Sequence, residues 1–356
     1  MKRYNDFHSN DTLLSDNFDI NNYCDNRTSD EEAIMPFLSF PILKACNFFC
    51  VYCGEAGEAT ASKQDKISLE MIKELVSIVK KLGVKKFRIT GGEPFLHKDI
   101  GRILYYFNNV GCYTLINTNG SLITDNKEIV CKLNPDLFKF AISLDTLNKE
   151  RFVDISRPRN PIYTLDKTLA GVEYLLEHDL LLRINMVVGM HNYDEVFDMI
   201  NFCKERKCRL KLLDIVSVPK PNENRQNYFV DLTNLEQELR EKCDNVFSHS
   251  YTKMFGVPCF QYKFGETFVT VKNGTKGSHY DLEGVCENCK FYPCHEGVYD
   301  IFAYSDGRIC SCRWRDDQKY ENTEKQLSYM IESFRRAQFL YGVNSLHEDM
   351  PNRQDI

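Results

Sequence analysis

Three cysteines on one short stretch have the spacing of a metal centre. Cys46, Cys50 and Cys53 follow one another in C-x3-C-x2-C order, directly after an apolar run over residues 37–43 that predicts a strand. Three thiolates on one loop can bind three irons of a cubic iron–sulfur cluster and leave the fourth iron open to a small molecule, whereas closed clusters are held by four thiolates. The spacing alone leaves a zinc site or buried thiols as alternatives.

A second group of cysteines lies in the C-terminal third of the chain. Cys286, Cys289 and Cys294 have C-x2-C-x4-C spacing, and Cys310-x-Cys312 follows an Asp-Gly turn. Such a group indicates a second metal centre. Because C-x2-C pairs also bind zinc, a zinc site is the alternative to an iron–sulfur cluster here.

Three polar stretches come at the ends of further apolar runs. They are Arg-Ile-Thr-Gly-Gly-Glu-Pro at 88–94, Asn-Thr-Asn-Gly at 117–120 and Ile-Ser-Leu-Asp at 142–145. Glycine lets the backbone approach a neighbour closely, so the Gly-Gly pair suits a crowded site. Parallel α/β folds place their sites at the carboxyl ends of strands, so these stretches and the cysteine loop are expected at one edge of a sheet.

The pattern between residues 36 and 217 alternates strand and helix, which predicts a parallel sheet. Six apolar runs predict strands at 37–43, 84–90, 113–117, 137–144, 180–188 and 210–216. Amphipathic segments predict helices at 69–82, 100–108, 125–133, 163–178 and 193–206. Ser68 has the side chain of a helix N-cap, and Gly83 is placed to end the first of these helices.

The remaining chain predicts smaller elements. We expect a helix at 232–243, a hairpin formed by 268–271 and the Asn273-Gly274 turn, a second hairpin over 299–312, and a closing helix at 323–340. The predicted organisation is a lead-in at 1–35, a core at 36–217, a linker with a helix at 218–250, a cysteine-rich module at 251–320, and a helix with a tail at 321–356.

Composition narrows the class of protein. The chain has 356 residues, 43% of them apolar, which allows one large domain or two. A net charge of −6 gives no basic patch for nucleic acid, and no run of 18 apolar residues predicts a membrane span. Fifteen cysteines without an apolar signal segment favour metal ligation in a reducing cytoplasm over a disulfide framework.

Taken in order, the cysteine loop and the three polar stretches resemble the radical S-adenosylmethionine (SAM) superfamily. The resemblance covers about residues 36–217. It implies an α/β fold, a partial (β/α)6 barrel of the TIM type with a small cysteine-rich C-terminal module. It also implies an enzyme that reductively cleaves SAM to a 5′-deoxyadenosyl radical, which abstracts hydrogen from an organic substrate, with flavodoxin or ferredoxin as reductant.

The resemblance carries roles to particular residues. Cys46, Cys50 and Cys53 match the ligands of the SAM-binding [4Fe–4S] cluster. The residues that match SAM contacts are Tyr52, Gly91, Gly92, Glu93, Pro94, Ser143 and Val216. Glu93 matches the partner of the SAM ammonium group, and Tyr52 and Val216 match adenine contacts. Ser143 could instead be a plain hydroxyl at a strand end, and Val216 an ordinary apolar residue.

The second cysteine group resembles the SPASM and twitch modules, which hold auxiliary clusters. Cys294, Gly307 and Cys312 fit their spacing, and no cysteine follows Cys312, so we expect one auxiliary [4Fe–4S] cluster rather than two. Its expected ligands are Cys286, Cys289, Cys294 and Cys312, with Cys310 as the substitute.

Within the superfamily, the motifs are most similar to the GTP 3′,8-cyclase branch. Arg88 and Arg183 match cationic positions that hold the triphosphate there, and Asn117 belongs to a shared stretch. Ser39, however, stands where that branch has an arginine, and the Arg-x-Arg run after the auxiliary C-x2-C is replaced by Lys290-Phe291. We therefore expect a substrate other than GTP. Arg88 and Arg183 then either meet an anionic substrate or form ion pairs at the barrel mouth.

Several functions remain open from the sequence. A small molecule, nucleotide or sugar is favoured as the substrate. The alternatives are a peptide-modifying maturase of the SPASM type, a cyclase-like enzyme, and a non-catalytic iron–sulfur or zinc module. Glu93 favours the enzyme, because an electron carrier has no need of a partner for the SAM ammonium group.

Overall fold

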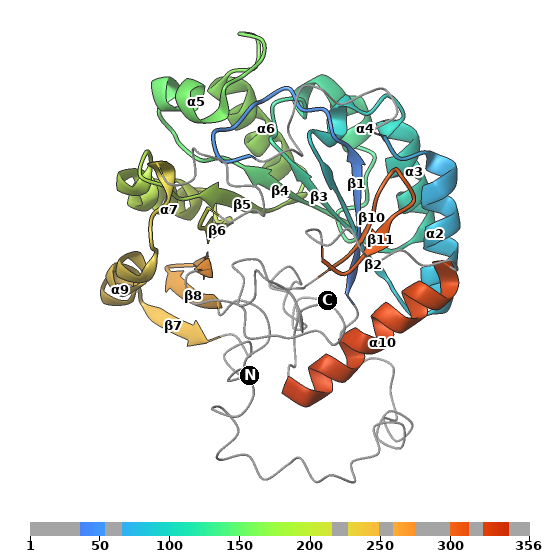
Figure 1. Cartoon of the computed structure of the whole chain (residues 1–356). Coiled ribbons are helices and arrows are strands. Elements are labelled where there is room, and N and C mark those ends of the chain that lie inside the picture. Colours follow the sequence, from blue (N-terminus) through green and yellow to red (C-terminus); the bar gives the residue numbers. More distant parts are fainter. Residues whose placement is uncertain are drawn as a thin grey trace. The chain divides into compact units, whose positions relative to one another are not determined.

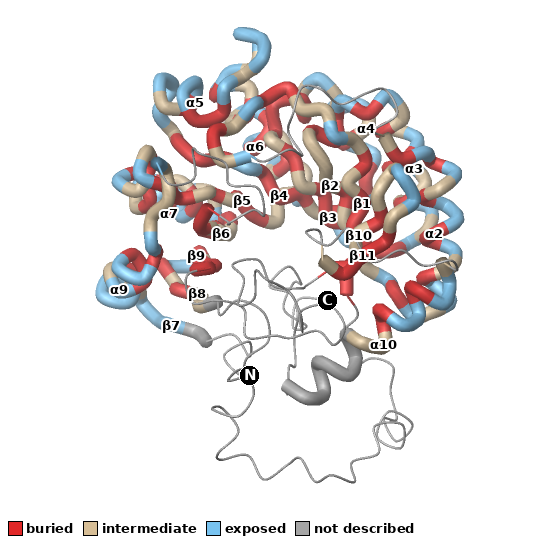
Figure 2. Tube along the Cα trace, in the orientation of Figure 1, coloured by how far each residue is buried: buried red, intermediate tan, exposed pale blue. Residues whose placement is uncertain are grey.

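The computed structural model describes residues 36–53, 66–215, 227–248, 259–274, 300–312 and 323–341. Their strands form a single sheet in the order β11-β10-β1-β2-β3-β4-β5-β6-β9-β8-β7. Figure 1 shows that this sheet curves, with helices along its outer side. Figure 2 shows buried positions along the strands and also within the helices, while exposed positions lie mainly on the helices and loops.

The central six strands are parallel and confirm the predicted α/β core. They are β1 (Phe37–Leu43), β2 (Lys86–Gly91), β3 (Tyr113–Thr118), β4 (Phe138–Ser143), β5 (Leu181–Val187) and β6 (Arg209–Leu213). The helices between them are α2 (Leu69–Lys81), α3 (Ile100–Val110), α4 (Lys127–Val130), α5 (Lys149–Ser156), α6 (Leu165–Glu177) and α7 (Val196–Glu205). Short 3-10 turns, η2 (Pro94–Leu96), η3 (Thr124–Asn126) and η4 (Tyr193–Glu195), lie near the strand ends.

Two helices differ from the expectation. The segment predicted as a helix at 125–133 is the turn η3 followed by the four-residue helix α4. Helix α5 was not predicted, although its start is clear in the structure: the Asn148 side chain accepts hydrogen bonds from the backbone N–H groups of Glu150 and Arg151. An asparagine N-cap of this kind satisfies backbone donors that the helix itself leaves unpaired.

The outer face of the sheet packs against the helices. Phe40 of β1 and Phe87 of β2 both contact Phe107 of α3, with ring centroids 6.1 and 5.2 Å apart. Helix α2 is capped as predicted, because Ser68 Oγ accepts from the Met71 N–H at 3.1 Å. Its apolar stripe of Leu69, Ile72, Leu75, Val76 and Val79 is buried.

The other face, here called the inner face, carries the alternate residues of each strand. At its base lie Phe37, Leu115 and Ala141, with Tyr113 and Leu182 packed against them. The parallel register sets Ser39 beside Arg88 and Arg88 beside Leu115, so polar and charged groups share this face with the apolar base.

Strands from the C-terminal part extend the core sheet at both edges. β10 (Asp300–Ala303) pairs in parallel with β1, and β11 (Ile309–Cys310) returns antiparallel to it, which confirms the second predicted hairpin. At the other edge β9 (Thr267–Lys272) pairs in parallel with β6, followed by β8 (Cys259–Phe264) and β7 (Asn245–Ser248).

The first predicted hairpin had the wrong turn. The chain reverses at Gly265-Glu266, between β8 and β9, and Gly265 has a φ of 63°. Asn273 and Gly274 instead follow β9 and are tied inward: the Asn273 amide donates to Glu236 at 3.3 Å, and the Gly274 N–H donates to Asp214 at 2.9 Å. These contacts are distant in sequence, so the Asn-Gly pair could not reveal them.

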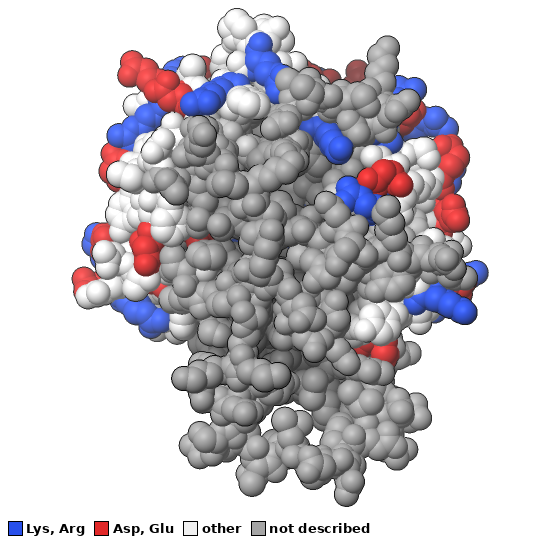
Figure 3. Space-filling view, viewed as in Figure 1, with Lys and Arg blue, Asp and Glu red and all other residues white. Residues whose placement is uncertain are grey.

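The predicted C-terminal helices are present. α9 (Thr233–Lys242) lies near the β7–β9 edge, and α10 (Thr323–Tyr341) contacts α2 and β11. No helix in the described part of the chain is long and apolar enough to cross a membrane. On the described surface in Figure 3, positive and negative side chains are interspersed.

Candidate active site

The cysteine loop, residues 44–53, follows β1 and is held by two neighbours. On one side the loop is bonded to the last turn of α5. The Phe49 N–H donates to the Ser156 carbonyl at 3.0 Å, and the Val51 N–H donates to the Ile155 carbonyl at 2.9 Å. Cys46 and Cys50 are half-buried and Cys53 is exposed. The unpredicted helix α5 therefore has a function in the site, because its last turn fixes the path of this loop.

On the other side the Gly-Gly pair clamps the loop to the end of β2. The Gly92 N–H donates to the Leu43 carbonyl at 2.6 Å, and the Glu93 N–H donates to the Ala45 carbonyl at 2.9 Å. A Cβ on Gly92 would lie 2.2 Å from the Ala45 oxygen, and one on Gly91, whose φ is +138°, would lie 2.3 Å from the Leu43 oxygen. No side chain fits at either position without moving the backbone.

The three thiols form a donor set suited to a cluster. Burial raises the pKa of the Cys46 thiol to about 11, and burial and the nearby Asp145 and Cys53 raise that of Cys50 too. Three thiolates in such surroundings require positive charge, which iron supplies. Among the described residues no three His, Cys, Asp or Glu side chains are gathered as around a single ion. A cube binds each thiolate to a different iron, so a cluster does not require the three sulfurs to surround a single ion.

Glu93 is a buried carboxylate with three hydrogen bonds. Its Oε1 accepts from the Phe95 N–H at 3.1 Å and from Thr118 Oγ1 at 2.8 Å, and its Oε2 accepts from the Asn119 N–H at 2.9 Å. Burial nevertheless raises the pKa of Glu93 to about 7. A cationic ligand at this carboxylate would stabilise its ionised form. Pro94, the next residue, begins the turn η2.

Tyr52 connects the cysteine loop to the ends of β4 and β5. Its hydroxyl donates to Asp145 Oδ2 at 2.5 Å, and Asp145 Oδ1 accepts from the Val187 N–H at 2.8 Å. Asn192 fixes the same region, because its amide donates to the carbonyls of Asp145 at 2.8 Å and Val187 at 2.9 Å. Asp145 ends the Ile-Ser-Leu-Asp stretch at 142–145. Its partner Tyr52 is 93 positions away, so nothing in the sequence indicated this contact.

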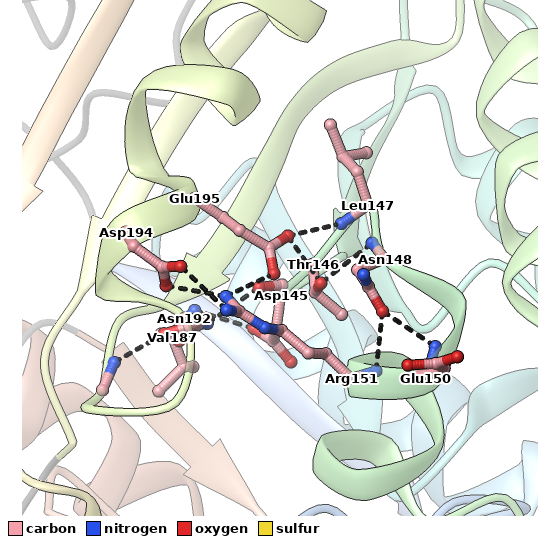
Figure 4. A network of polar contacts seen from close by, with 11 residues as sticks. Asp145, Thr146, Leu147, Asn148, Glu150, Arg151, Val187, Asn192, Asp194 and Glu195 are labelled. Atoms are coloured by element: carbon pink, nitrogen blue, oxygen red, sulfur yellow. Dashed lines mark hydrogen bonds and ion pairs between the residues drawn. The ribbon is translucent and has the colours of Figure 1, made fainter.

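Figure 4 shows that this connection continues into an ion-pair network. Buried Glu195 accepts from Thr146 Oγ1 at 2.6 Å and from the Leu147 N–H at 3.0 Å. Arg151 of α5 donates to Glu195 at 2.8 Å and to both oxygens of Asp194, at 2.6 and 2.8 Å. The loop after β4, the start of α5 and the turn η4 are therefore held as one unit behind Asp145.

The inner face brings Arg88 and Ser39, two positions compared above with the cyclase branch, together with Asp300, which had no signal in the sequence. Arg88 forms an ion pair with Asp300 Oδ2, and Ser39 Oγ donates to the same oxygen at 2.7 Å. The Arg88 guanidinium carbon also lies 4.6 Å from the centroid of the Phe37 ring. Of the two interpretations given for Arg88, the structure displays the ion pair.

Arg183 and Asn117 lie on the same face. Arg183 is buried, sits beside Ala141 in the parallel register, and donates through Nε to Asn185 Oδ1 at 2.8 Å. Asn117 sits beside Ala141 from the other side, on β3. Both residues therefore lie on the inner face, on either side of Ala141 of the apolar base.

The remaining predicted residues are placed as follows. Ser143 is exposed at the end of β4, in register with Asn185. Cys310 is buried in β11, opposite Phe302, and Cys312 is half-buried just beyond the strand. Val216, Cys286, Cys289 and Cys294 lie outside the described residues.

Comparison with known families and curated proteins gives one consistent result. Residues 40–203 match the model of the radical SAM superfamily. The probable GTP 3′,8-cyclase of Methanothermobacter marburgensis is 28% identical over 303 residues, which cover 84% of this chain and 90% of that protein. The GTP 3′,8-cyclase of Clostridium perfringens (strain 13 / Type A) is 31% identical over 62% of this chain and 67% of its own length.

Solved structures show a similar fold at low identity. Streptococcus suis SuiB bound to S-adenosylmethionine has a TM-score of 0.61 and 19% identity, over 84% of this chain and 66% of SuiB. The match therefore spans just under two thirds of SuiB. Native anSMEcpe with bound AdoMet has a TM-score of 0.53 and 18% identity, over 85% of this chain and 83% of that one.

Proposed function

Because the chain belongs to the radical SAM superfamily, we propose that it abstracts hydrogen from a small organic molecule bound on the inner face of its sheet. In this family a [4Fe–4S] cluster and SAM, when bound, supply an electron and a 5′-deoxyadenosyl radical. The observation that carries the proposal is the clamp of the cysteine loop against Gly91 and Gly92, with Glu93 buried directly beside it.

The residues of the clamp have separate roles in this proposal. Cys46, Cys50 and Cys53 would hold the cluster as three thiolate ligands, which would leave one iron open to SAM. Glu93 would accept a hydrogen bond from the SAM ammonium group, and its three internal hydrogen bonds already hold the carboxylate in place. Such preorganisation lowers the free energy spent on orienting a bound group.

Tyr52 and Ser143 complete the SAM side of the site in the proposal. The bond to Asp145 holds the Tyr52 ring at one position between Cys50 and Cys53, where it can lie against the adenine. Ser143 is exposed at the end of β4 and offers a hydroxyl to SAM. Val216 is proposed as the adenine contact after β6.

The second cysteine group is proposed to hold one auxiliary [4Fe–4S] cluster. Cys286, Cys289, Cys294 and Cys312 are the proposed ligands, with Cys310 as the substitute. Cys312 follows β11, and β10 joins this hairpin directly to β1, the strand that leads into the cysteine loop. A cluster bound there would be attached to the same sheet as the SAM site.

The proposed substrate is a small molecule other than GTP. The curated relatives are named as GTP 3′,8-cyclases, and SuiB has been solved bound to a precursor peptide. In this chain Ser39 occupies a position that is an arginine in the cyclase branch, and a triphosphate is best bound by several arginines. A flavodoxin or ferredoxin is proposed as the physiological reductant, in the cytoplasm.

The experiment compares substrates under one set of conditions. Anaerobically reconstituted protein receives SAM and dithionite together with a dialysable metabolite fraction, a peptide fraction or GTP. We expect the metabolite fraction to stimulate 5′-deoxyadenosine formation and GTP to have little effect. Stimulation by the peptide fraction alone would favour a maturase, and robust formation of 3′,8-cyclo-GTP would refute the exclusion of GTP.

A further inference from the structure

Asp300 lies on the inner face, beside the positions expected to contact substrate. It is the first residue of β10, in register with Phe37, and it is 1% exposed. One of its carboxylate oxygens, Oδ2, receives both the Arg88 guanidinium and the Ser39 hydroxyl. The three residues come from β10, β2 and β1, and Ser39 and Asp300 are 261 positions apart.

The ion pair removes the free charge of Arg88. A guanidinium and a carboxylate in contact carry no net charge, and burying the pair gives each a partner that an incoming anion would have to replace. Arg88 is also fixed from another side, by the Phe37 ring. A phosphate that approached Arg88 would therefore meet the negative charge of Asp300 at the same point.

The second oxygen of Asp300 is an open acceptor. Oδ1 is buried and makes no hydrogen bond within the structure described here. A buried carboxylate oxygen without a donor is costly, so this oxygen calls for a partner, which a bound ligand can supply. Asn117 Oδ1, on the same face, is a further buried acceptor to which no described residue donates.

We propose that Asp300 determines the specificity of the substrate site. It neutralises Arg88, so that this position rejects a phosphate, and it offers Oδ1 to a hydroxyl or amino group of the substrate. The inference rests on the proposed function only in placing the substrate on the inner face. A binding measurement, made without reductant, therefore tests it separately from the radical chemistry.

The test is nucleotide binding to the anaerobically reconstituted full chain, with GTP and guanosine as probes. In the unmodified protein we expect GTP to bind no more tightly than guanosine. Asp300→Asn keeps the shape of the side chain and removes the negative charge beside Arg88, and we expect GTP to bind at least about tenfold more tightly, which corresponds to about 1.4 kcal/mol. Adding Arg88→Gln to this variant should return the affinity for GTP to that of the unmodified protein.

A matched control accounts for the change in net charge. Asp166→Asn removes an exposed carboxylate that pairs with Lys149, and it should leave GTP binding unchanged. The proposal would be overturned if Asp166→Asn and Asp300→Asn increased the affinity for GTP equally. It would also be overturned if Asp300→Asn, in protein with full iron content, did not increase the affinity for GTP. If Asp300→Asn does not fold, Asp300→Ser replaces it. GTP binding much tighter than guanosine in the unmodified protein would also overturn it.

Discussion

The Tyr52 hydroxyl donates to Asp145 Oδ2 at 2.5 Å, across 93 residues of sequence. The bond joins the loop that carries the three cysteines to the ends of β4 and β5. Asp145 is itself fixed by the Val187 N–H, and the segment behind it is fixed by Asn192. The position of the Cys50–Cys53 segment thus depends on a network that starts outside the loop.

Removal of this hydroxyl should loosen the loop. Tyr52→Phe leaves buried Asp145 with one donor fewer, and hydrogen bonds to charged groups contribute about 1.5–3 kcal/mol. We expect a loss of that order in the free energy of unfolding, measured by urea denaturation, and a higher KM for SAM. Tyr105→Phe, at an exposed position of α3, is the control and should change neither quantity. Equal stability of the two variants would contradict the role given to Asp145.

The second prediction concerns the Gly-Gly clamp. Gly92→Ala would place a methyl group 2.2 Å from the Ala45 carbonyl oxygen, so the cysteine loop must move away from β2. We expect the variant to lose the SAM-binding cluster, as seen by iron analysis and electron paramagnetic resonance. Gly111→Ala is the control, because nothing lies within 4 Å of its added carbon. Its positive φ should lower stability by about 1 kcal/mol without loss of iron. A normal cluster in Gly92→Ala would show that the clamp is not needed.

The third prediction is a pH dependence of SAM binding. Burial raises the pKa of Glu93 to about 7, and only the ionised carboxylate attracts the SAM ammonium group. As pH falls below this pKa the ionised fraction decreases, so the Kd for SAM should rise by up to about tenfold per pH unit. Above it the Kd should level off. Equilibrium dialysis between pH 5.5 and 8.5 measures this (both limits being about 1.5 units from the pKa). Glu93→Gln should bind weakly and without this slope, and an identical slope in the variant would assign the titration to another group.

The core of the fold was predictable because its signals are local. Six apolar runs, the Ser68 cap and the glycines at strand ends each act within a few residues, and the structure confirms the parallel strands they predicted. The position of the cysteine loop after the first strand was predictable for the same reason.

The parts that were missed depend on contacts between distant residues. The Asn273-Gly274 pair has the composition of a hairpin turn, but hydrogen bonds to Glu236 and Asp214 hold it beyond β9. The pairing of Asp300 with Ser39 and Arg88 requires β10 to lie beside β1, and no periodicity within either strand specifies that neighbour. Helix α5 begins at an asparagine cap within a polar segment, where hydrophobic periodicity is weak.

The fourth prediction concerns the auxiliary centre. Two cubes of four irons would give about eight irons per chain. Cys312→Ala should reduce this to about four, with the SAM-binding cluster retained. Cys310→Ala, two residues earlier and buried in β11, is the matched comparison and should retain about eight if Cys312 is the ligand. About four irons with one zinc in the unmodified protein would instead identify the second centre as a zinc site.

The most direct test of the central claim is the formation of 5′-deoxyadenosine from SAM by anaerobically reconstituted, dithionite-reduced protein. The unmodified chain should form it. Combined replacement of Cys46, Cys50 and Cys53 by alanine should abolish the product while about four irons remain at the second centre. Undiminished 5′-deoxyadenosine formation by the triple variant would contradict the assignment of this loop as the radical-generating site.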